Sequence, residues 1–347
     1  MPEVNAEALR PPAASVSRPP ADWRPSAARL ISLAVSGALL IGLYRSVNFR
    51  LIGAELRGVD RVWLVFSLGM IVPITMLRAI RFFWVAPAGA LPGIVEALRL
   101  TLVATALNVF LPAKTGDLIK SYFVAKRGGT SAGVSVAIIV YERLCDVFGL
   151  MTWCVLGWLV ARPVVAGVPS ALWPLLGAVG VVCAVLISSE RVARLGPAMM
   201  ARALPDRLHR WQALLEGWPD LFRVLRGRRG WEALFCLLLW LVHLVQIWMF
   251  ALALSVPIPF TLCASLSAVA LLAGQLPLTV AGLGARDVAL VVLLSGYVRP
   301  EAAAAMGILI ATRGLLPPLA ALPFMRSYLS AVVGEVRVAK REGAHPA

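Results

Sequence analysis

Charged side chains are scarce in this chain of 347 residues: they make up 15% of it, against about 25% in an ordinary soluble domain. Apolar residues make up 60%, and the mean hydropathy is +0.82. A soluble domain of this length must cover itself with a polar surface, and there is too little charge here to form one. The composition therefore excludes a water-soluble globular protein and indicates a membrane protein.

Acidic residues are scarcer than basic ones, with 18 Asp and Glu against 33 Lys and Arg and a formal net charge of +15. In a soluble protein such an excess would indicate nucleic-acid binding. In a membrane protein Lys and Arg gather in cytoplasmic loops, and this accounts for the excess without such a partner. We therefore expect no nucleic acid as a ligand.

Cysteine and histidine occur in no metal-binding or catalytic pattern. The five cysteines lie in apolar runs without a C-x-x-C spacing, and the three histidines are scattered. Common nucleotide-binding, zinc-protease and serine-hydrolase signatures are absent as well. The sequence therefore predicts no metal and no cofactor, and it indicates a protein without a catalytic centre.

About six apolar runs approach or reach the length of about 20 residues that a membrane-crossing helix needs. A Pro-, Ala- and Arg-rich stretch at 1–29 precedes them, and we expect it to be a disordered tail. The first run lacks an A-x-A-like cleavage site, so we interpret it as a retained span that opens a transmembrane domain at 30–325, followed by a tail at 326–347. The predicted spans are Leu30–Tyr44, Val62–Leu77, Val134–Val160, Ala171–Ser188, Glu232–Ser255 and Ala302–Phe324.

Two further apolar stretches are interrupted by Pro and Gly. Pro removes a helix donor and Gly loosens the backbone, and the arms that follow the interruptions are too short to cross a membrane. Broken backbone survives at membrane depth only where protein or water covers it. We therefore predict two re-entrant broken-helix hairpins. The first joins Val95–Phe110 to Leu118–Val124, and the second joins Leu262–Leu276 to Val288–Val298.

Basic residues predict which loops face the cytoplasm. Residues 189–230 hold nine Arg against four acids, so we expect this loop to be cytoplasmic. The linkers 161–170 and 256–260 hold one charge between them, as external loops do. With about six spans, both termini then lie in the cytoplasm. One feature opposes this topology, because it leaves an external loop that carries Arg45, Arg50, Arg57 and Arg61.

The two halves of the transmembrane domain follow a common order. Each has a long span, an apolar arm, a Leu-Pro break, a Gly followed by an acid, a short arm and a long span with an embedded arginine, Arg143 or Arg313. Hairpins that enter from opposite faces in this order suggest an inverted repeat, as in many transporters with broken helices. The expected fold is an all-α polytopic membrane protein with about six full spans and two re-entrant hairpins.

Charge inside apolar segments is the most informative feature, because intramembrane charge is unfavourable and usually functional. Glu142 and Asp146 lie one helical turn apart, and Arg143 lies within pairing reach of Asp146. We predict a buried charge network of these three residues with Arg313. Whether this network only orients the helices or takes part in function stays open.

Arg78 and Arg81 directly follow the second predicted span. They could extend to lipid phosphates, but we interpret them as topology anchors at its cytoplasmic end.

Each interruption is followed by a helix start that carries cations. A helix N-terminus presents free N–H groups and a partial positive charge, which suits a phosphate. The cations are Lys114 and Lys120 in the first stretch and Arg286 in the second. Asp117 and Asp287 either cap the helix starts or balance these cations. The sequence therefore predicts a site for an anionic head group.

At these residues the chain resembles a known family. The stretches 107–120, 142–146 and 276–287 occur in the order found in the flippase-like membrane domain of the lysylphosphatidylglycerol synthase/flippase family and its stand-alone relatives. The resemblance covers roughly residues 30–330 and places Asn108 in the head-group site. Glu is commoner in the family where Asp117 and Asp287 stand here. About 20 residues follow the last span, so we expect no aminoacyl-transferase domain and no transfer of lysine.

The resemblance implies a lipid flippase of the bacterial inner (cell) membrane. We therefore expect translocation of an anionic phospholipid or a lipid-linked head group, with membrane phospholipids as ligands. Because no nucleotide-binding motif is present, transport would be passive or ion-coupled. Two alternatives stay open: a membrane-embedded enzyme that uses Glu142, Asp146 or Asp117 on a lipid-linked substrate, and a non-catalytic partner of a lipid or glycan biosynthesis enzyme. A homo-oligomer also stays open.

Overall fold

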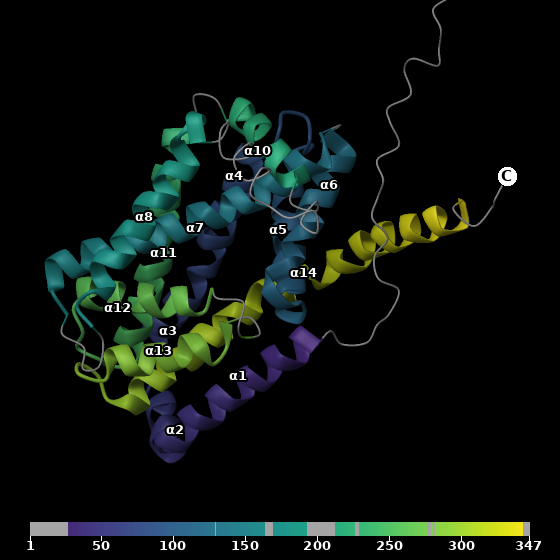
Figure 1. The fold of residues 1–347 in the computed structure, drawn as a ribbon. Coiled ribbons are helices and arrows are strands. Elements are labelled where there is room, and N and C mark those ends of the chain that lie inside the picture. Colours follow the sequence, from purple (N-terminus) through teal and green to yellow (C-terminus); the bar gives the residue numbers. More distant parts are fainter. Residues whose placement is uncertain are drawn as a thin grey trace, which may run out of the picture.

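The computed structural model describes residues 27–342 apart from 129, 164–168, 193–211, 226–228, 276–278, 280 and 281. All regular elements in this described part are helices, and they pack into one bundle (Figure 1). The all-α membrane fold expected from the sequence is confirmed at this level.

Four helices or helix pairs are long and apolar enough to cross a membrane, and each coincides with a predicted span. The first comprises α3 (Arg61–Gly69) and α4 (Ile71–Val85). The others are α7 (Ala132–Ala161), α11 (Arg229–Ala253) and α14 (Pro300–Glu342). Their long apolar runs exceed the length needed to cross the hydrocarbon core, which is why they were readily found from the sequence.

The remaining two predicted spans are less regular. Helix α1 (Ala27–Ser46) is followed by α2 (Phe49–Arg57), and the pair bends by 86°. The bend occurs where the Asn48 side chain accepts a hydrogen bond from the Arg50 N–H and so begins a new helix. Helix α8 (Leu172–Ser188) has only 17 residues. By length and composition the described residues therefore contain four candidate spans, or five if the bent pair counts as one.

Helix α4 continues beyond the predicted end of its span. The sequence placed that end at Leu77, before two arginines, whereas the helix runs on to Val85. The placement of Arg81 as an anchor at the membrane surface is wrong, because its side chain is buried at 3% exposure. The reason is tertiary: carboxylates of α7 neutralise Arg81 inside the protein.

The helix breaks at both predicted interruptions, and the arms on either side pack together. The first hairpin comprises α5 (Ile94–Phe110), the short 3-10 helix η2 (Pro112–Asp117) and α6 (Leu118–Gly128). The second comprises α12 (Phe260–Ala273) and α13 (Ala285–Leu294). Figure 1 shows α5 and α6 on one side of the bundle and α12 and α13 on the other.

Glycine permits a close approach of the backbone in each hairpin. A Cβ atom on residue 116 would lie 2.6 Å from the Asn108 backbone nitrogen, so η2 lies directly on the last turn of α5. Gly282 has a φ of +76°, and a Cβ atom there would lie 2.5 Å from the Gly274 oxygen. Both positions therefore require glycine, the second also because left-handed backbone disfavours a side chain.

Two hydrophobic clusters form the core, and α11 contributes to both. The first gathers buried residues of α4, α5, α7 and the start of α11, among them Tyr141 and Leu244. The second gathers residues of α11, α12, α13 and α14, among them Ile247 and Phe250. Helix α10 (Gln212–Val224) covers the first cluster, since Trp218 packs 6.2 Å from Tyr141, centroid to centroid. Helix α11 therefore joins the two halves of the core.

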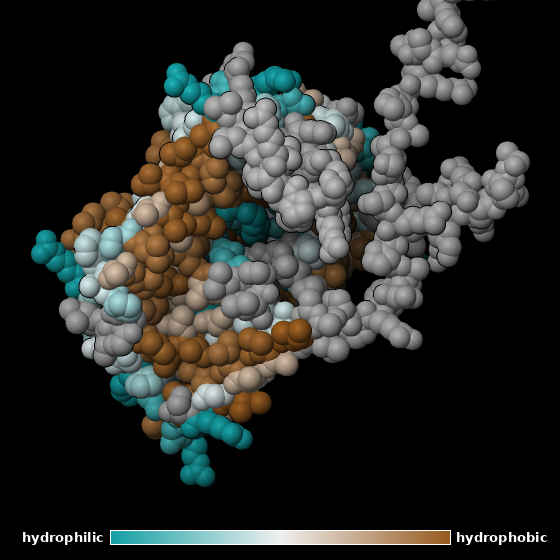
Figure 2. Space-filling model, in the orientation of Figure 1, coloured by the Kyte–Doolittle hydropathy of each residue, from teal (hydrophilic) through white to brown (hydrophobic). Residues whose placement is uncertain are grey.

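The outer surface has the character of a membrane protein. Large apolar side chains are exposed, for example Val160 at 72%. Figure 2 shows that hydrophobic residues dominate one face and that hydrophilic residues gather at its ends. The same face is hollowed near its middle, and hydrophilic residues lie inside this hollow (Figure 2). Polar groups are therefore present within an otherwise apolar envelope.

Candidate functional site

An ion-pair network lies where α4, α6 and α7 meet. Arg81 Nη1 donates to Asp146 Oδ1 at 2.7 Å. Its Nε lies 3.6 Å from Glu142 Oε1, which is an ion pair but too long for a hydrogen bond. Glu142 also accepts from Lys120, with 3.1 Å between Nζ and Oε2. Arg81 and Lys120 thus share the Glu142 carboxylate.

Arg143 and Asp117 complete this network. Arg143 Nη2 bonds Asp117 Oδ2, and its Nη1 lies 3.4 Å from Asp146 Oδ2. Asn108 Nδ2 donates to Asp117 Oδ1 at 3.2 Å, and Lys120 Nζ lies 4.0 Å from the same oxygen. We call this the six-charge network; it consists of Arg81, Asp117, Lys120, Glu142, Arg143 and Asp146.

The six-charge network is electrically balanced, with three cations and three carboxylates. Apolar side chains and helix α11 enclose it: Lys120 Nζ lies 4.8 Å from the centre of the Phe82 ring, and Arg81 Nη1 lies 3.7 Å from Cys236 Sγ. Removing one member of such a buried set would leave an uncompensated charge. The network therefore ties the first hairpin to α4 and α7.

Several residues that were predicted from the sequence as two separate groups lie together in this network. Glu142, Arg143 and Asp146 lie together as expected, and Asn108, Asp117 and Lys120, expected at the head-group site, join them. Arg81 was missed as a member. The signal was in the sequence, because the apolar run Phe82–Val85 follows it and would be stranded in water if Arg81 marked the membrane surface.

The second hairpin holds a smaller, self-contained ion pair. Arg286 donates to Asp287 Oδ1 from Nη2 at 2.7 Å and from Nε at 3.1 Å. Asp287 Oδ2 accepts from the Gly284 N–H at 3.1 Å, at the start of α13. Both roles foreseen for Asp287, helix cap and counter-charge, therefore apply. Arg286 also points to the next helix, with Nη2 at 3.4 Å from the Gly307 oxygen.

Arg313 lies apart from the six-charge network that it was expected to join. It is buried at 7% exposure, and its Nη1 bonds Gln246 Oε1. Gln246 in turn donates from Nε2 to the Ser67 backbone oxygen at 2.6 Å. This chain connects α14, α11 and α3. Among the described residues no carboxylate pairs with Arg313, so its charge is met only by an amide dipole.

Arg78 is a second cation without a direct counter-ion. It is half-buried one turn before Arg81 on α4, where it interacts electrostatically with Asp117, Asp146 and Arg143. Within the described ranges it makes neither a hydrogen bond nor an ion pair. Since the acids near it are already matched in the six-charge network, Arg78 adds one net positive charge to this region.

Lys114 cannot be placed at a site. Its backbone belongs to η2, but its side chain lies outside the described residues. The role of Lys114 at the head-group site therefore stays a prediction.

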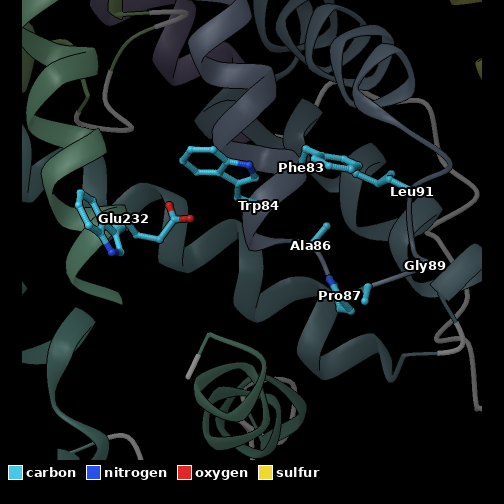
Figure 3. A pocket seen from close by; sticks show the side chains of 9 residues that line it. Phe83, Trp84, Ala86, Pro87, Gly89, Leu91 and Glu232 are labelled. Carbon is cyan, nitrogen blue, oxygen red and sulfur yellow. The ribbon is translucent and has the colours of Figure 1, made fainter. Parts of the chain in front are cut away.

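A pocket of about 660 Å³ lies away from these residues, between the end of α4 and the start of α11 (Figure 3). Trp84 and Trp231 line it, and the Glu232 carboxylate reaches toward Trp84 (Figure 3). None of the predicted site residues borders this pocket. Among the side chains that the structure describes, no group of three His, Cys, Asp or Glu could hold a metal ion.

Comparison with known proteins agrees with a membrane protein. No curated protein matches the chain significantly. The family model described as lysylphosphatidylglycerol synthase TM region matches residues 29–321. That range contains both hairpins, the six-charge network and Arg313, and it confirms the resemblance noted from the sequence. The chain belongs to the family of the lysylphosphatidylglycerol synthase transmembrane region.

Proposed function

We propose that this protein translocates an anionic phospholipid or a lipid-linked head group across the membrane. One observation carries the proposal: among the described residues, the half-buried Arg78 and the buried Arg313 pair with no carboxylate. The six-charge network and the Arg286–Asp287 pair, in contrast, are each neutral. Family membership supports a lipid-related role in a membrane.

An unbalanced buried guanidinium is unfavourable for the folded protein. Charges inside membrane segments are rare, face an interior or a watery cavity, and mark pathways for substrates and ions. The six-charge network holds α4, α6 and α7 together with each cation matched by a carboxylate, whereas Arg78 and Arg313 have no such partner among the described residues. These two guanidinium groups are therefore best explained by a ligand that brings negative charge.

In this proposal the two hairpins form the two ends of the lipid pathway. We propose that the first hairpin, with Asn108, Lys114, Asp117 and Lys120, receives the head group near one face, and that Arg286 and Asp287 receive it near the other. Transport would be passive or coupled to an ion. In this proposal no bond of the lipid is broken, so the protein acts as a transporter and not as an enzyme.

We further propose that the protein lies in the bacterial inner membrane with both termini in the cytoplasm. The arginine excess of 189–230 supports this orientation, because basic loops are retained on that side. A membrane-impermeant thiol reagent should label a cysteine introduced at Ala166 in intact cells and spare one at Arg226. The five native cysteines are all buried and give little background. Labelling at position 226 and not at position 166 would show that the orientation is the opposite of the one proposed.

The function is tested with the purified full chain in liposomes that carry a fluorescent phosphatidylglycerol. A quencher added outside should remove the signal of both leaflets when the protein is active and only that of the outer leaflet in empty liposomes. The control variant Arg50→Gln removes an arginine that is exposed in α2, so it should transport lipid at the rate of the parent. Quenching of the outer leaflet alone, across a panel of anionic lipids, would reject translocation and favour a non-transporting partner of a biosynthetic enzyme.

A further inference from the structure

A polar line runs along α11 between the six-charge network and Arg313. Cys236, Trp240, His243 and Gln246 recur at three- and four-residue intervals and therefore share one face of the helix. At one end Cys236 Sγ lies 3.7 Å from Arg81 Nη1, and at the other Gln246 bonds Arg313. The ten residue steps from Cys236 to Gln246 correspond to about 15 Å of helix. We call these four residues the α11 line.

The middle of the α11 line contains buried polar atoms without partners. Trp240 Nε1 and His243 Nδ1 are both inaccessible and form no hydrogen bond with the residues that the structure describes. Their rings pack together, with 4.9 Å between centroids. Buried polar atoms are nearly always paired in folded proteins, so two adjacent exceptions indicate a place that a ligand or ordered water completes.

The charges around the α11 line are predominantly positive. His243 interacts electrostatically with Arg313 and Arg78, and Arg313 is repelled by Arg286 and by Arg78, which lies on the neighbouring α4. The acid that acts electrostatically on His243 is Asp146, which Arg81 and Arg143 already neutralise. Both guanidinium groups therefore act on His243, and within the described part of the chain neither pairs with a carboxylate.

We propose that Arg78, Arg313 and the α11 line bind a terminal phosphate that carries two negative charges, as in a lipid phosphomonoester or diphosphate. This inference rests on the proposed function and names its substrate class. A phosphodiester such as phosphatidylglycerol carries one charge and would leave one guanidinium unmatched. A terminal phosphate carries about −1.5 to −2 at neutral pH and presents three acceptor oxygens. Guanidinium forks match these oxygens geometrically.

The test measures binding and transport separately on the full-length protein. Binding is the rise in melting temperature in detergent on adding phosphatidic acid, a polyprenyl diphosphate, phosphatidylglycerol or phosphatidylcholine. Transport is the liposome assay with a fluorescent version of each lipid. We expect phosphatidic acid and the diphosphate to exceed phosphatidylglycerol severalfold in both measurements, and phosphatidylcholine to have no effect. A response to only one of the first two would identify which source of the doubly charged phosphate the site accepts.

Variants then tie this preference to the arginines. Arg313→Gln and Arg78→Gln should each lower the response to phosphatidic acid to the level of phosphatidylglycerol, whereas Arg313→Lys should keep most of the preference. The melting temperature without lipid shows that each variant is folded. Equal responses to phosphatidic acid and phosphatidylglycerol in the parent would overturn this inference and leave the proposed function standing. Preferential binding of phosphatidic acid without transport of any lipid would support the site and reject translocation.

Discussion

The six-charge network and the region around Arg313 are both buried and both polar, but they differ in charge balance. In the network three cations meet three carboxylates across four structural elements, α4, η2, α6 and α7. Around Arg313 and Arg78 the same type of side chain meets amide groups, an imidazole and another cation. Buried charges that neutralise each other hold helices in place, whereas buried charges of one sign keep a region ready for an oppositely charged ligand.

Arg81→Gln should have the largest effect on stability. It removes the cation that pairs with Asp146 and Glu142 and leaves the network with three carboxylates and two cations, so one buried negative charge is uncompensated. Removal of one partner from a buried ion pair lowers the free energy of unfolding by about 3–5 kcal/mol. The melting temperature in detergent should fall steeply, and the double variant Arg81→Gln with Asp146→Asn should recover part of the loss. An unchanged melting temperature would contradict the structural role of the network.

Arg313→Gln should show the opposite pattern. No carboxylate is left behind, and the loss of one hydrogen bond to Gln246 is offset by removal of an unmatched buried charge. We expect an unchanged or higher melting temperature. The rate of lipid transport should fall roughly tenfold or more, which corresponds to a rise of about 1.5–3 kcal/mol in its activation free energy. A variant that loses stability as Arg81→Gln does would remove the distinction between the two regions.

Gly116→Ala tests how closely the network depends on the first hairpin. The added methyl group would meet Asn108 and Ala104 backbone atoms at 2.6 and 2.8 Å, so η2 must move away from α5 and carry Asp117 with it. Such overpacking lowers the free energy of unfolding by about 1–3 kcal/mol. Gly53→Ala in α2 is the control, because nothing lies within 4 Å of its new atom. Equal melting temperatures for the two variants would show that the hairpin tolerates the shift.

Arg223→Gln should have the smallest effect and isolates the role of burial. Arg223 Nη1 lies 2.7 Å from Asp220 Oδ1, the same separation as in the Arg81–Asp146 pair, but its side chain is 70% exposed. Exposed ion pairs contribute about 0–1 kcal/mol because water screens them. The melting temperature should therefore stay within error of the parent. A drop comparable with that of Arg81→Gln would show that distance, and not burial, decides the strength of these pairs.

Local features of the sequence predicted most of the fold. Apolar length located the four long spans, and the Leu-Pro and Gly positions located both helix breaks, because these signals act within a few residues. The end of α4 was misplaced, since its continuation depends on Asp146, a residue 65 positions away in the chain. The number of spans is not settled by length at α1 and α2, where the helix pair bends by 86° beside an asparagine N-cap.

The sequence predicted which residues belong to the candidate site better than it predicted which of them contact each other. Intramembrane charge singled out Glu142, Arg143 and Asp146, and the Asp117 position was found from the break. Which cation meets which acid is a tertiary property, so Arg81 was assigned to the surface and Arg313 to the network. Gln246, the hydrogen-bond partner of Arg313, was not predicted as a site residue, because an uncharged residue in an apolar run carries no comparable signal.

Helix α11 contacts Arg81 through Cys236 and Arg313 through Gln246. These two contacts fix the distance between Cys236 and Gln246 along the helix and also the directions in which their side chains point. Each residue of an α-helix advances the side-chain direction by about 100°. An insertion or deletion of a single residue between these two positions would turn one contact away from its partner while the other stayed in place. The segment from Cys236 to Gln246 can thus change its composition far more readily than its length.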